Sequence, residues 1–397
     1  MERLYKRNIP LDYLYTFIKN VNVTHGLWLL FLAFKGFSLF EIGIFEGVFH
    51  LTSLTMEVPT GLIADIYGRK LSRVLSILAY LIYIILMVYS ADFGVIIIAF
   101  VFCGLSYTLE SGAGDALVYD SLKNIGEEDK FMKVNGNKEV IYQVSSTIAL
   151  FIGGYLALTN FELPFAVAFI TFLVALLVIY FMKETLIEIN PEQKSLKELL
   201  YDQYVSSMKI ILNNKRLLYL IIIAASVAAP VTTVFLYIAF YFDELEYSRF
   251  LIGTILAGHS IFSALGGYFA YTLEKKYQEK KILYFVPLFI TLSFFLIQFE
   301  ISLIISFVLL GFFDSLFYVV LADYINKQTP SKNRATVFSV FGMTFSIIMI
   351  IIFPVVGYIG ETVNLKFALL ILAIMVGVFN IFLIVVLKRN HLNTCKK

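Results

Sequence analysis

Long apolar segments recur along the whole chain and alternate with short polar turns. Most are close to the ~20 residues that an α-helix needs to cross the hydrocarbon core of a bilayer. Because backbone groups in lipid must satisfy their own hydrogen bonds, and because the alternation typical of a membrane barrel does not occur, these segments are predicted to be helices. The predicted fold class is therefore an all-α membrane protein with twelve transmembrane helices, over residues 10–34, 40–64, 71–90, 93–120, 134–158, 163–182, 216–242, 249–272, 282–299, 301–324, 335–359 and 365–387.

The basic residues predict the orientation of these helices. If the amino terminus is cytoplasmic, 27 of the 31 Lys and Arg residues fall in cytoplasmic segments and 3 in external loops. Such a bias is typical of membrane proteins, whose cytoplasmic loops are rich in Lys and Arg. No small-residue cleavage site closes the first apolar segment, so we expect it to be a retained span. We predict a multi-pass protein of the cell (plasma) membrane with both termini in the cytoplasm.

Composition excludes several classes of protein. Of the residues, 59% are hydrophobic and 15% are charged, against about 25% charged in soluble proteins. The net charge of +2, without a basic tract, gives no reason to expect a nucleic-acid partner. Cys103 and Cys395 lack the spacing of a disulfide framework or a metal site, so no metal and no cofactor are expected. Neither a phosphate-binding loop nor a catalytic motif occurs, so the chain is not expected to be an enzyme.

One long connection divides the chain into two halves. The predicted domains are a six-helix bundle over residues 1–183, a cytoplasmic linker with an amphipathic helix over 184–215, and a second six-helix bundle over 216–397. Within the linker, Ser195-Leu196-Lys197-Glu198 has the pattern of a capping box. A shift of 206 residues supports the duplication, because it places Gly47, Gly61, Arg69 and Lys70 on Gly253, Gly267, Lys275 and Lys276. Duplicated bundles are a transporter architecture.

The turn after the second span carries a motif, Gly61-x-x-x-Asp65-x-x-Gly68-Arg69-Lys70. It resembles the G-x-x-x-D-x-x-G-R-K loop of the major facilitator superfamily (MFS), and the twelve spans in two halves agree with this family. The resemblance implies a transporter with alternating access, in which the loop acts as a cytoplasmic gating latch. Arg69 would then reach Asp120 at the end of the fourth span. Gly61 would allow close helix approach, and Gly68 would allow a tight turn.

The basic residues near this turn have an alternative interpretation. The positive charges of Lys70 and Arg73 could serve only to fix the topology of the neighbouring spans. For Asp65 and Arg69 the latch is the favoured interpretation, because Arg forms a bidentate pair with a carboxylate and a carboxylate is stabilised at a helix N-terminus.

Ionisable residues inside the predicted spans are candidates for a coupling or substrate site, because each costs about 2.5–3.5 kcal/mol on insertion scales. Lys19 and Glu110 lie at similar depths and could pair, with Glu57 as the competing partner. Such a pair is either a static clamp or a site where Glu110 or Glu57 carries a coupling proton. For the two histidines, packing is favoured over ligand binding. The full set of candidates is Lys19, Glu46, His50, Glu57, Glu110, Asp115, His259 and Asp314.

The predicted function is secondary active transport of a small organic molecule, as proton-coupled efflux. The stretch Glu57-Val58-Pro59-Thr60-Gly61, with the motif that follows it, is similar to bacterial multidrug and tetracycline exporters. The alternative is an ion-coupled uptake permease for a nutrient or metabolite, and a remote alternative is a transporter-like sensor or membrane enzyme. The predicted partners are the small-molecule substrate, protons or Na⁺ as the coupling ion, and membrane lipid, with the protein acting as a monomer.

Overall fold

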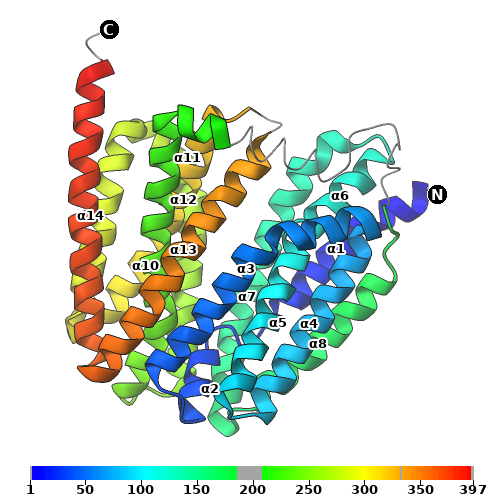
Figure 1. The fold of residues 1–397 in the computed structure, drawn as a ribbon, viewed down its shortest axis with the longest axis horizontal. Coiled ribbons are helices and arrows are strands. Elements are labelled where there is room, and N and C mark those ends of the chain that lie inside the picture. The colour runs from blue at the N-terminus through cyan, green and yellow to red at the C-terminus, as the bar shows by residue number, and fades with distance from the viewer. Residues whose placement is uncertain (1, 186–207, 331–332, 395–397) are drawn as a thin grey trace. The chain divides into compact units, whose positions relative to one another are not determined.

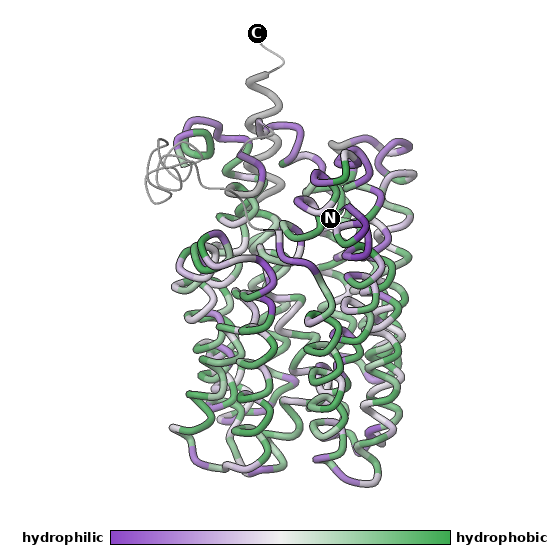
Figure 2. Tube along the Cα trace, turned by 90° about the vertical axis from the view of Figure 1, so that its right-hand side faces the viewer, coloured by the Kyte–Doolittle hydropathy of each residue, from purple (hydrophilic) through white to green (hydrophobic). Residues whose placement is uncertain are grey.

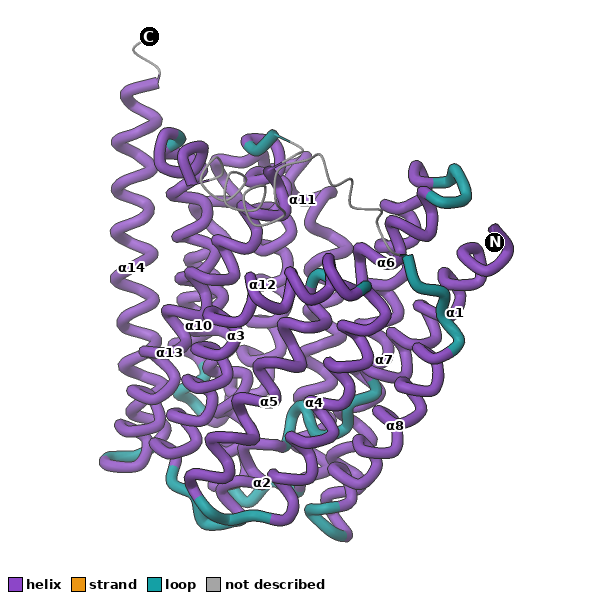
Figure 3. Tube along the Cα trace, turned by 45° about the vertical axis from the view of Figure 1, so that its right-hand side comes forward, coloured by secondary structure: helices purple, strands orange, loops and turns teal. Residues whose placement is uncertain are grey.

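The computed structural model of the protein describes residues 2–185, 208–330 and 333–394, without the side chains of 279–280, 335–336 and 383–394. All regular elements in these ranges are helices, and no strand occurs there (Figure 3). The protein is therefore all-α, as the apolar pattern predicts. The predicted linker helix around residues 195–198 lies outside the described residues.

The described residues form two compact units. The first falls within Met1–Asn190 together with Ala239–Ala257, and the second within Pro191–Ile238 together with Gly258–Lys397. The division therefore also passes through two helices, α10 (Lys215–Glu244) and α11 (Arg249–Leu296). The predicted domains, divided only at the linker, stay a prediction.

The first unit is built from helices that pack side by side (Figure 1). The α4 helix packs on α5 and α8, α3 packs on α5, and α1 packs on α7 and α8. A buried apolar core that includes Tyr15, Leu117 and Phe172 lies between them. The elements are α1 (Glu2–Asn20), α2 (Trp28–Phe34), α3 (Leu39–Tyr67), α4 (Arg69–Tyr89), α5 (Phe93–Ser111), α6 (Ala113–Lys123), the 3-10 helix η1 (Glu128–Lys130), α7 (Phe131–Thr159) and α8 (Leu163–Tyr180).

The second unit contains most of α10 and α11, together with α12 (Glu300–Gln328), α13 (Arg334–Thr362) and α14 (Leu365–Thr394). The α11 helix is interrupted at Gln278, whose backbone has φ 61° and ψ 161°. It therefore supplies two apolar helices, Arg249–Gln278 and Lys281–Leu296. In the core, the ring of Tyr237 stacks on Phe353 with centroids 4.4 Å apart, and its hydroxyl donates to the Phe353 carbonyl over 3.0 Å.

Ten of the predicted spans are confirmed as helices that are long and apolar enough to cross a membrane, counted among the described residues. Figure 2 shows that apolar residues fill the lengths of these helices and that hydrophilic residues gather near their ends. The predicted ninth span corresponds to the shorter helix Lys281–Leu296, and the predicted first span is broken. The full count of twelve therefore stays a prediction.

The break in the first span has a local cause between α1 and α2. The Asn22 side-chain oxygen accepts a hydrogen bond from the Thr24 hydroxyl over 2.8 Å, and its amide donates to the Tyr80 hydroxyl. A short polar side chain that bonds to neighbouring groups offers the chain an alternative to the helix. The predicted fourth span corresponds to α5 and α6, which meet at Gly112 and together form the apolar stretch Phe93–Lys123.

Candidate functional site

The turn between α3 and α4 consists of Gly68 alone, with φ 111° and ψ 151°. Only glycine adopts this backbone conformation readily, so the predicted tight turn is confirmed. The turn brings charged side chains together. Arg69 forms an ion pair with Asp65 on the preceding helix, and its Nε lies 3.8 Å from Oδ2 of Asp120 on α6. The proximity of Arg69 and Asp120 that the motif implied is thus present.

Lys70 and Glu184 connect this turn to the end of α8. The Lys70 ammonium donates to the carbonyls of Tyr180 over 2.7 Å and Met182 over 2.9 Å. In return, the Glu184 carboxylate accepts the backbone N–H of Lys70, in the first turn of α4, at 3.0 Å. A cation at a helix C-terminus and an anion at a helix N-terminus both stabilise the helix dipoles. Lys70 therefore has structural partners beyond any influence on topology, and Glu184 was not predicted.

Gly61 does not make the expected close helix approach. A Cβ atom added to this residue would meet no heavy atom within 4 Å in the structure. Within the first unit, no described residue therefore requires a glycine at this position. A role of Gly61 in close packing against other helices stays a prediction.

A second cluster of charges is centred on Arg73, one turn further along α4. Its guanidinium donates to Oδ1 of Asp12 over 2.7 Å and to Oε1 of Glu110 over 3.1 Å. The Tyr15 ring covers the guanidinium, with its centroid 4.0 Å from Cζ. Arg73 is 1% exposed and Asp12 is fully buried. Arg73 is therefore the cation that holds α1, α4 and α5 together, and a purely topological role does not explain its burial.

The predicted pair of Lys19 and Glu110 is present but long. The Lys19 ammonium lies 3.8 Å from Oε1 of Glu110, the same oxygen that Arg73 contacts. The other oxygen of Glu110 accepts the Tyr15 hydroxyl over 2.8 Å. Glu110 is thus bound mainly by Arg73 and Tyr15, and Lys19 is its outermost partner.

Lys138 connects this cluster to two further helices, α7 and α6. Its ammonium lies 3.3 Å from Oδ2 of Asp12 and 2.8 Å from Oδ1 of Asp115. Asp115, one of the predicted candidates, therefore belongs to the cluster through a lysine that was not predicted. Asp12 is shared between two cations, Arg73 and Lys138.

Three other predicted residues of the first unit lie on α3, apart from the Arg73 cluster. Nε2 of His50 lies 3.4 Å from Oε1 of Glu46, and both side chains are buried. Glu57 accepts a hydrogen bond from the Ser111 hydroxyl over 3.5 Å and forms no ion pair with the described residues. The structure therefore does not bring Glu57 to Lys19, so the competing pair is not found.

The two predicted residues of the second unit differ in their surroundings. His259 is buried, and its ring stacks on Phe307 with centroids 4.6 Å apart and lies near Phe235 at 5.1 Å. This environment agrees with a packing role. Asp314 on α12 is partly buried and makes no side-chain hydrogen bond or ion pair with any described residue.

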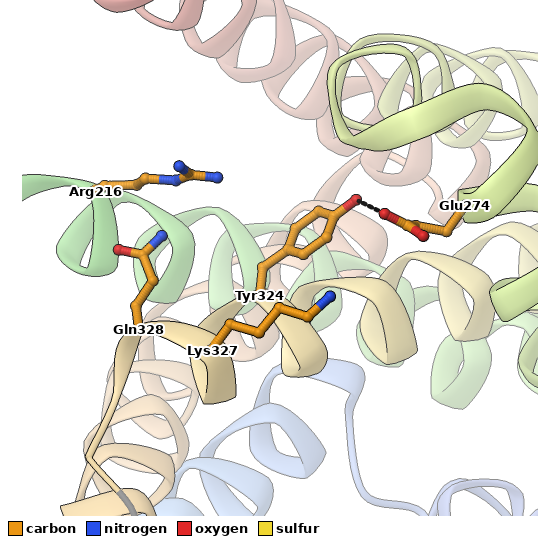
Figure 4. A pocket seen from close by; sticks show the side chains of 5 residues that line it. All are labelled: Arg216, Glu274, Tyr324, Lys327 and Gln328. Carbon is orange, nitrogen blue, oxygen red and sulfur yellow. Dashed lines mark hydrogen bonds between the residues drawn. The ribbon is translucent and has the colours of Figure 1, made fainter.

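The second unit also contains a polar cavity of about 340 Å³ where α10 begins and α12 ends (Figure 4). In it, the Tyr324 hydroxyl donates to Glu274 over 3.1 Å, and Lys327 pairs with Asp323. The lining residues are Arg216, Glu274, Tyr324, Lys327 and Gln328. The lining thus contains two cations and one carboxylate, and Asp323, which pairs with Lys327, lies outside it.

Arg73 and Lys138 are the residues that the sequence pattern failed to assign to a site. Both lie inside predicted spans, within 71–90 and 134–158, yet each is close enough to a span end to count among the cytoplasmic positive charges. Their position inside predicted spans could have indicated a site, because a cation within the membrane needs a partner. Glu184 follows the sixth span directly, and no pattern in the sequence connects it to the α4 turn.

Helices long and apolar enough to cross a membrane, packed in two compact units, define a helical membrane protein as the class, and buried ion pairs join helices of the first unit. The sequence model of the Major Facilitator Superfamily matches residues 21–299 and 239–394. The chain belongs to this family. It is therefore a transporter that is embedded in a membrane and acts on a small molecule, and it is not expected to be an enzyme.

Known proteins similar to the chain agree with the family. The MFS-type transporter YxaM of Bacillus subtilis (strain 168) is 24% identical over 343 residues, with 79% of each chain covered. A variant of the nucleoside transporter NupG has a similar structure, with a TM-score of 0.77, 15% identity, and coverage of 96% of this chain and 99% of NupG. The D-xylose-proton symporter has a TM-score of 0.71 and 13% identity, with coverage of 96% and 97%. At these identities the structural likeness shows the fold alone.

Proposed function

We propose that the protein is a secondary active transporter that exports a small organic molecule across the cell membrane in exchange for protons. Membership of the Major Facilitator Superfamily supports transport by alternating access. In this proposal the chain crosses the membrane twelve times with both termini in the cytoplasm, because that topology puts 27 of its 31 Lys and Arg residues on the cytoplasmic side.

The observation that carries the coupling proposal is the contrast between Glu57 and Glu110. A coupling carboxylate must bind and release a proton in each cycle. Protonation of Glu110 would disrupt its contacts with Arg73 at 3.1 Å and Lys19 at 3.8 Å and leave these cations without their partner. Glu57 has only a long hydrogen bond from Ser111, so its protonation leaves no cation unpaired. Glu57 is therefore the proton carrier, and Glu110 is a structural ion-pair partner.

Asp314 is the corresponding candidate in the second unit. It is an intramembrane acid on α12 that makes no ion pair with any described residue. An isolated carboxylate in a span is costly and calls for a functional explanation. It serves as the second proton site if Glu57 alone does not account for coupling.

The Arg69 turn acts as the gating latch of this transporter. Arg69 contacts Asp65 on its own side of the turn and Asp120 on α6. A cation that holds two carboxylates can release one of them when the helices move, because each contact alone is modest at a partly exposed site. Export as the direction of transport is supported by the resemblance of the Glu57–Gly61 stretch to bacterial exporters.

The proposal is tested in two stages. A susceptibility screen, which compares cells with and without the protein across toxic compounds, supplies a transported solute. Purified protein in liposomes is then given that solute under an imposed pH gradient. Accumulation in vesicles that are acidic inside indicates antiport, and accumulation in vesicles that are acidic outside indicates symport and therefore uptake. Accumulation that is driven by a Na⁺ gradient but not by a pH gradient would identify Na⁺, in place of the proton, as the coupling ion.

The Glu57→Gln variant tests the carrier within the same assay. We expect it to abolish accumulation driven by the pH gradient while leaving exchange of labelled for unlabelled solute. Glu139→Gln is the matched control, because Glu139 is an exposed residue on α7 whose side chain, among the described residues, accepts a hydrogen bond from Gln143 alone. If Glu57→Gln and Asp314→Asn both keep the full response to pH, neither residue carries the proton.

A further inference from the structure

We propose that the Lys19 side chain binds an anionic group of the transported molecule, so that the protein selects organic anions such as carboxylates. This inference rests on the proposed transport function and adds the class of substrate to it. It is carried by the unequal pairing of the three cations in the Arg73 cluster.

Two of these cations are saturated by carboxylates. Arg73 contacts Asp12 at 2.7 Å and Glu110 at 3.1 Å. Lys138 lies within 3.3 Å of Asp12 and 2.8 Å of Asp115. Each therefore has two carboxylates within the distance of a charge-assisted hydrogen bond or a close ion pair.

Lys19 is the cation that this arrangement leaves poorly paired. The only carboxylate within 4 Å of its ammonium, among the described residues, is that of Glu110 at 3.8 Å, through an oxygen that Arg73 already contacts at 3.1 Å. Its ammonium has three donors, yet it makes no hydrogen bond with any described residue. The nearest aromatic group, the Tyr15 ring, lies 5.8 Å from the nitrogen.

The charges around Lys19 balance in number but not in distance. Three cations and three carboxylates make up the cluster, and Asp115, although 56% exposed, pairs with Lys138 at 2.8 Å. The close contacts belong to Arg73, at 2.7 Å from Asp12, and to Lys138. The contact of Lys19 with Glu110, at 3.8 Å, is the longest of the three.

Lys19 is also the accessible member of the three. Its side chain is 23% exposed, against 1% for Arg73 and 15% for Lys138. An anionic group that contacts Lys19 would accept the N–H donors that Glu110 does not reach at 3.8 Å. A cationic group would be repelled by the ammonium, and a neutral group would offer it no opposite charge within a span.

The experiment measures binding of matched solutes to purified protein. The probes are 1-naphthoate, 1-naphthylmethanol and 1-naphthylmethylamine, together with the same three head groups on phenyl, cyclohexyl and indolyl skeletons. Each set keeps one apolar skeleton and changes only the charge of the head group. Binding is followed by the shift in thermal unfolding temperature of the protein in detergent.

We expect carboxylates to bind more tightly than their alcohols and amines on at least one skeleton. Lys19→Met should weaken carboxylate binding by about tenfold or more, because a charge-assisted hydrogen bond is lost, and Lys19→Arg should restore most of it. Lys133→Met on α7, which removes an exposed lysine that forms no hydrogen bond or ion pair with the described residues, is the control. The unfolding temperature without solute shows whether each variant is folded.

Three results would overturn the inference: preference for alcohols or amines, no carboxylate binding by the wild-type protein at millimolar concentration, or carboxylate binding that Lys19→Met leaves unchanged. The outcome is separable from the proposed function. If a solute identified by the susceptibility screen is driven by the pH gradient but carries no negative charge, the transport proposal stands and the anion site fails. If carboxylates bind through Lys19 without any response to pH, the anion site stands and proton coupling fails.

Discussion

Arg73 donates a hydrogen bond to Asp12 over 2.7 Å, and the two side chains are 1% and 0% exposed. The pair joins α4 to α1 at a position where neither charge can reach water. A buried pair of this kind adds little net stability compared with apolar residues of the same size, but removing one partner costs about 3–5 kcal/mol because the other charge remains buried. Each of the two residues therefore stabilises the fold only while the other is present.

The first prediction follows from this dependence. Arg73→Met and Asp12→Asn should each lower the thermal unfolding temperature of the purified protein markedly. The double variant should lose less stability than the two single losses added together, because the unpaired charge is removed. Thermal unfolding in detergent measures all three, with Lys133→Met as a variant that leaves the cluster intact. Additive losses would show that the two residues act independently.

The second prediction concerns the contact between Arg69 and Asp120. Arg69→Asp and Asp120→Arg should each impair transport of a solute identified in the susceptibility screen. The double reversal should restore part of the rate, because opposite charges again face each other across 3.8 Å. Restoration is expected to be partial, since Asp65 would then lie beside a second carboxylate. Lys133→Asp, an exposed change on α7, is the control. A double variant no better than either single one, although folded and inserted, would count against a direct pair.

Motif spacing and hydropathy predicted much of this architecture. The predicted spans 40–64 and 71–90 correspond to α3 and α4, and the resemblance of the motif to its family implied the proximity of Arg69 and Asp120. The motif is a local sequence pattern, and hydropathy depends only on how deep each residue lies within a span. Depth also predicted the pair of Lys19 and Glu110, but it could not show that Arg73 lies closer to the same oxygen.

The remaining parts of the site depend on how helices rotate against one another. Lys138 meets Asp12 across 126 positions of the chain and Glu184 meets Lys70 across 114, so no local pattern could pair them. The break near Asn22 was hidden for a similar reason. Its hydrogen bond goes to Tyr80, a residue of another span, whereas hydropathy averages over one span at a time.

The third prediction compares two glycines of the motif. A Cβ atom at Gly68 would clash with the Glu184 carboxylate, on a backbone with φ 111°. Gly68→Ala should therefore lower stability by about 1–3 kcal/mol, the cost of such a conformation for other residues. Gly61→Ala is the matched control, because its Cβ would meet no neighbour within 4 Å, and alanine is favoured over glycine in a helix by about 0.5–1 kcal/mol.

Thermal unfolding of both variants checks this comparison. Transport adds a second measurement, because Gly61 could serve close packing in another conformation of the cycle. In that case Gly61→Ala would keep its stability and lose transport. Equal unfolding temperatures for Gly68→Ala and the wild-type protein would contradict the strained turn.

The fourth prediction concerns Gly154 on α7, which lies against Gly253 on α11 within the first unit. A Cβ atom at Gly154 would lie 2.8 Å from the Arg249 carbonyl oxygen and 3.0 Å from the Gly253 Cα. Both neighbours are backbone atoms, so they cannot turn aside as a side chain can. Arg249 adds to this contact, because it donates to the Ala157 carbonyl over 2.8 Å.

Gly154→Ala should therefore force α7 and α11 apart and lower stability by about 1–3 kcal/mol, as overpacking does elsewhere. Gly136→Ala on the same helix is the matched control, because its Cβ would meet no heavy atom within 4 Å and should leave the unfolding temperature unchanged or slightly raised. Thermal unfolding of the two variants in detergent measures the difference. If both alanines behave alike, the approach of α7 to α11 tolerates a methyl group, and the glycines are not required for it.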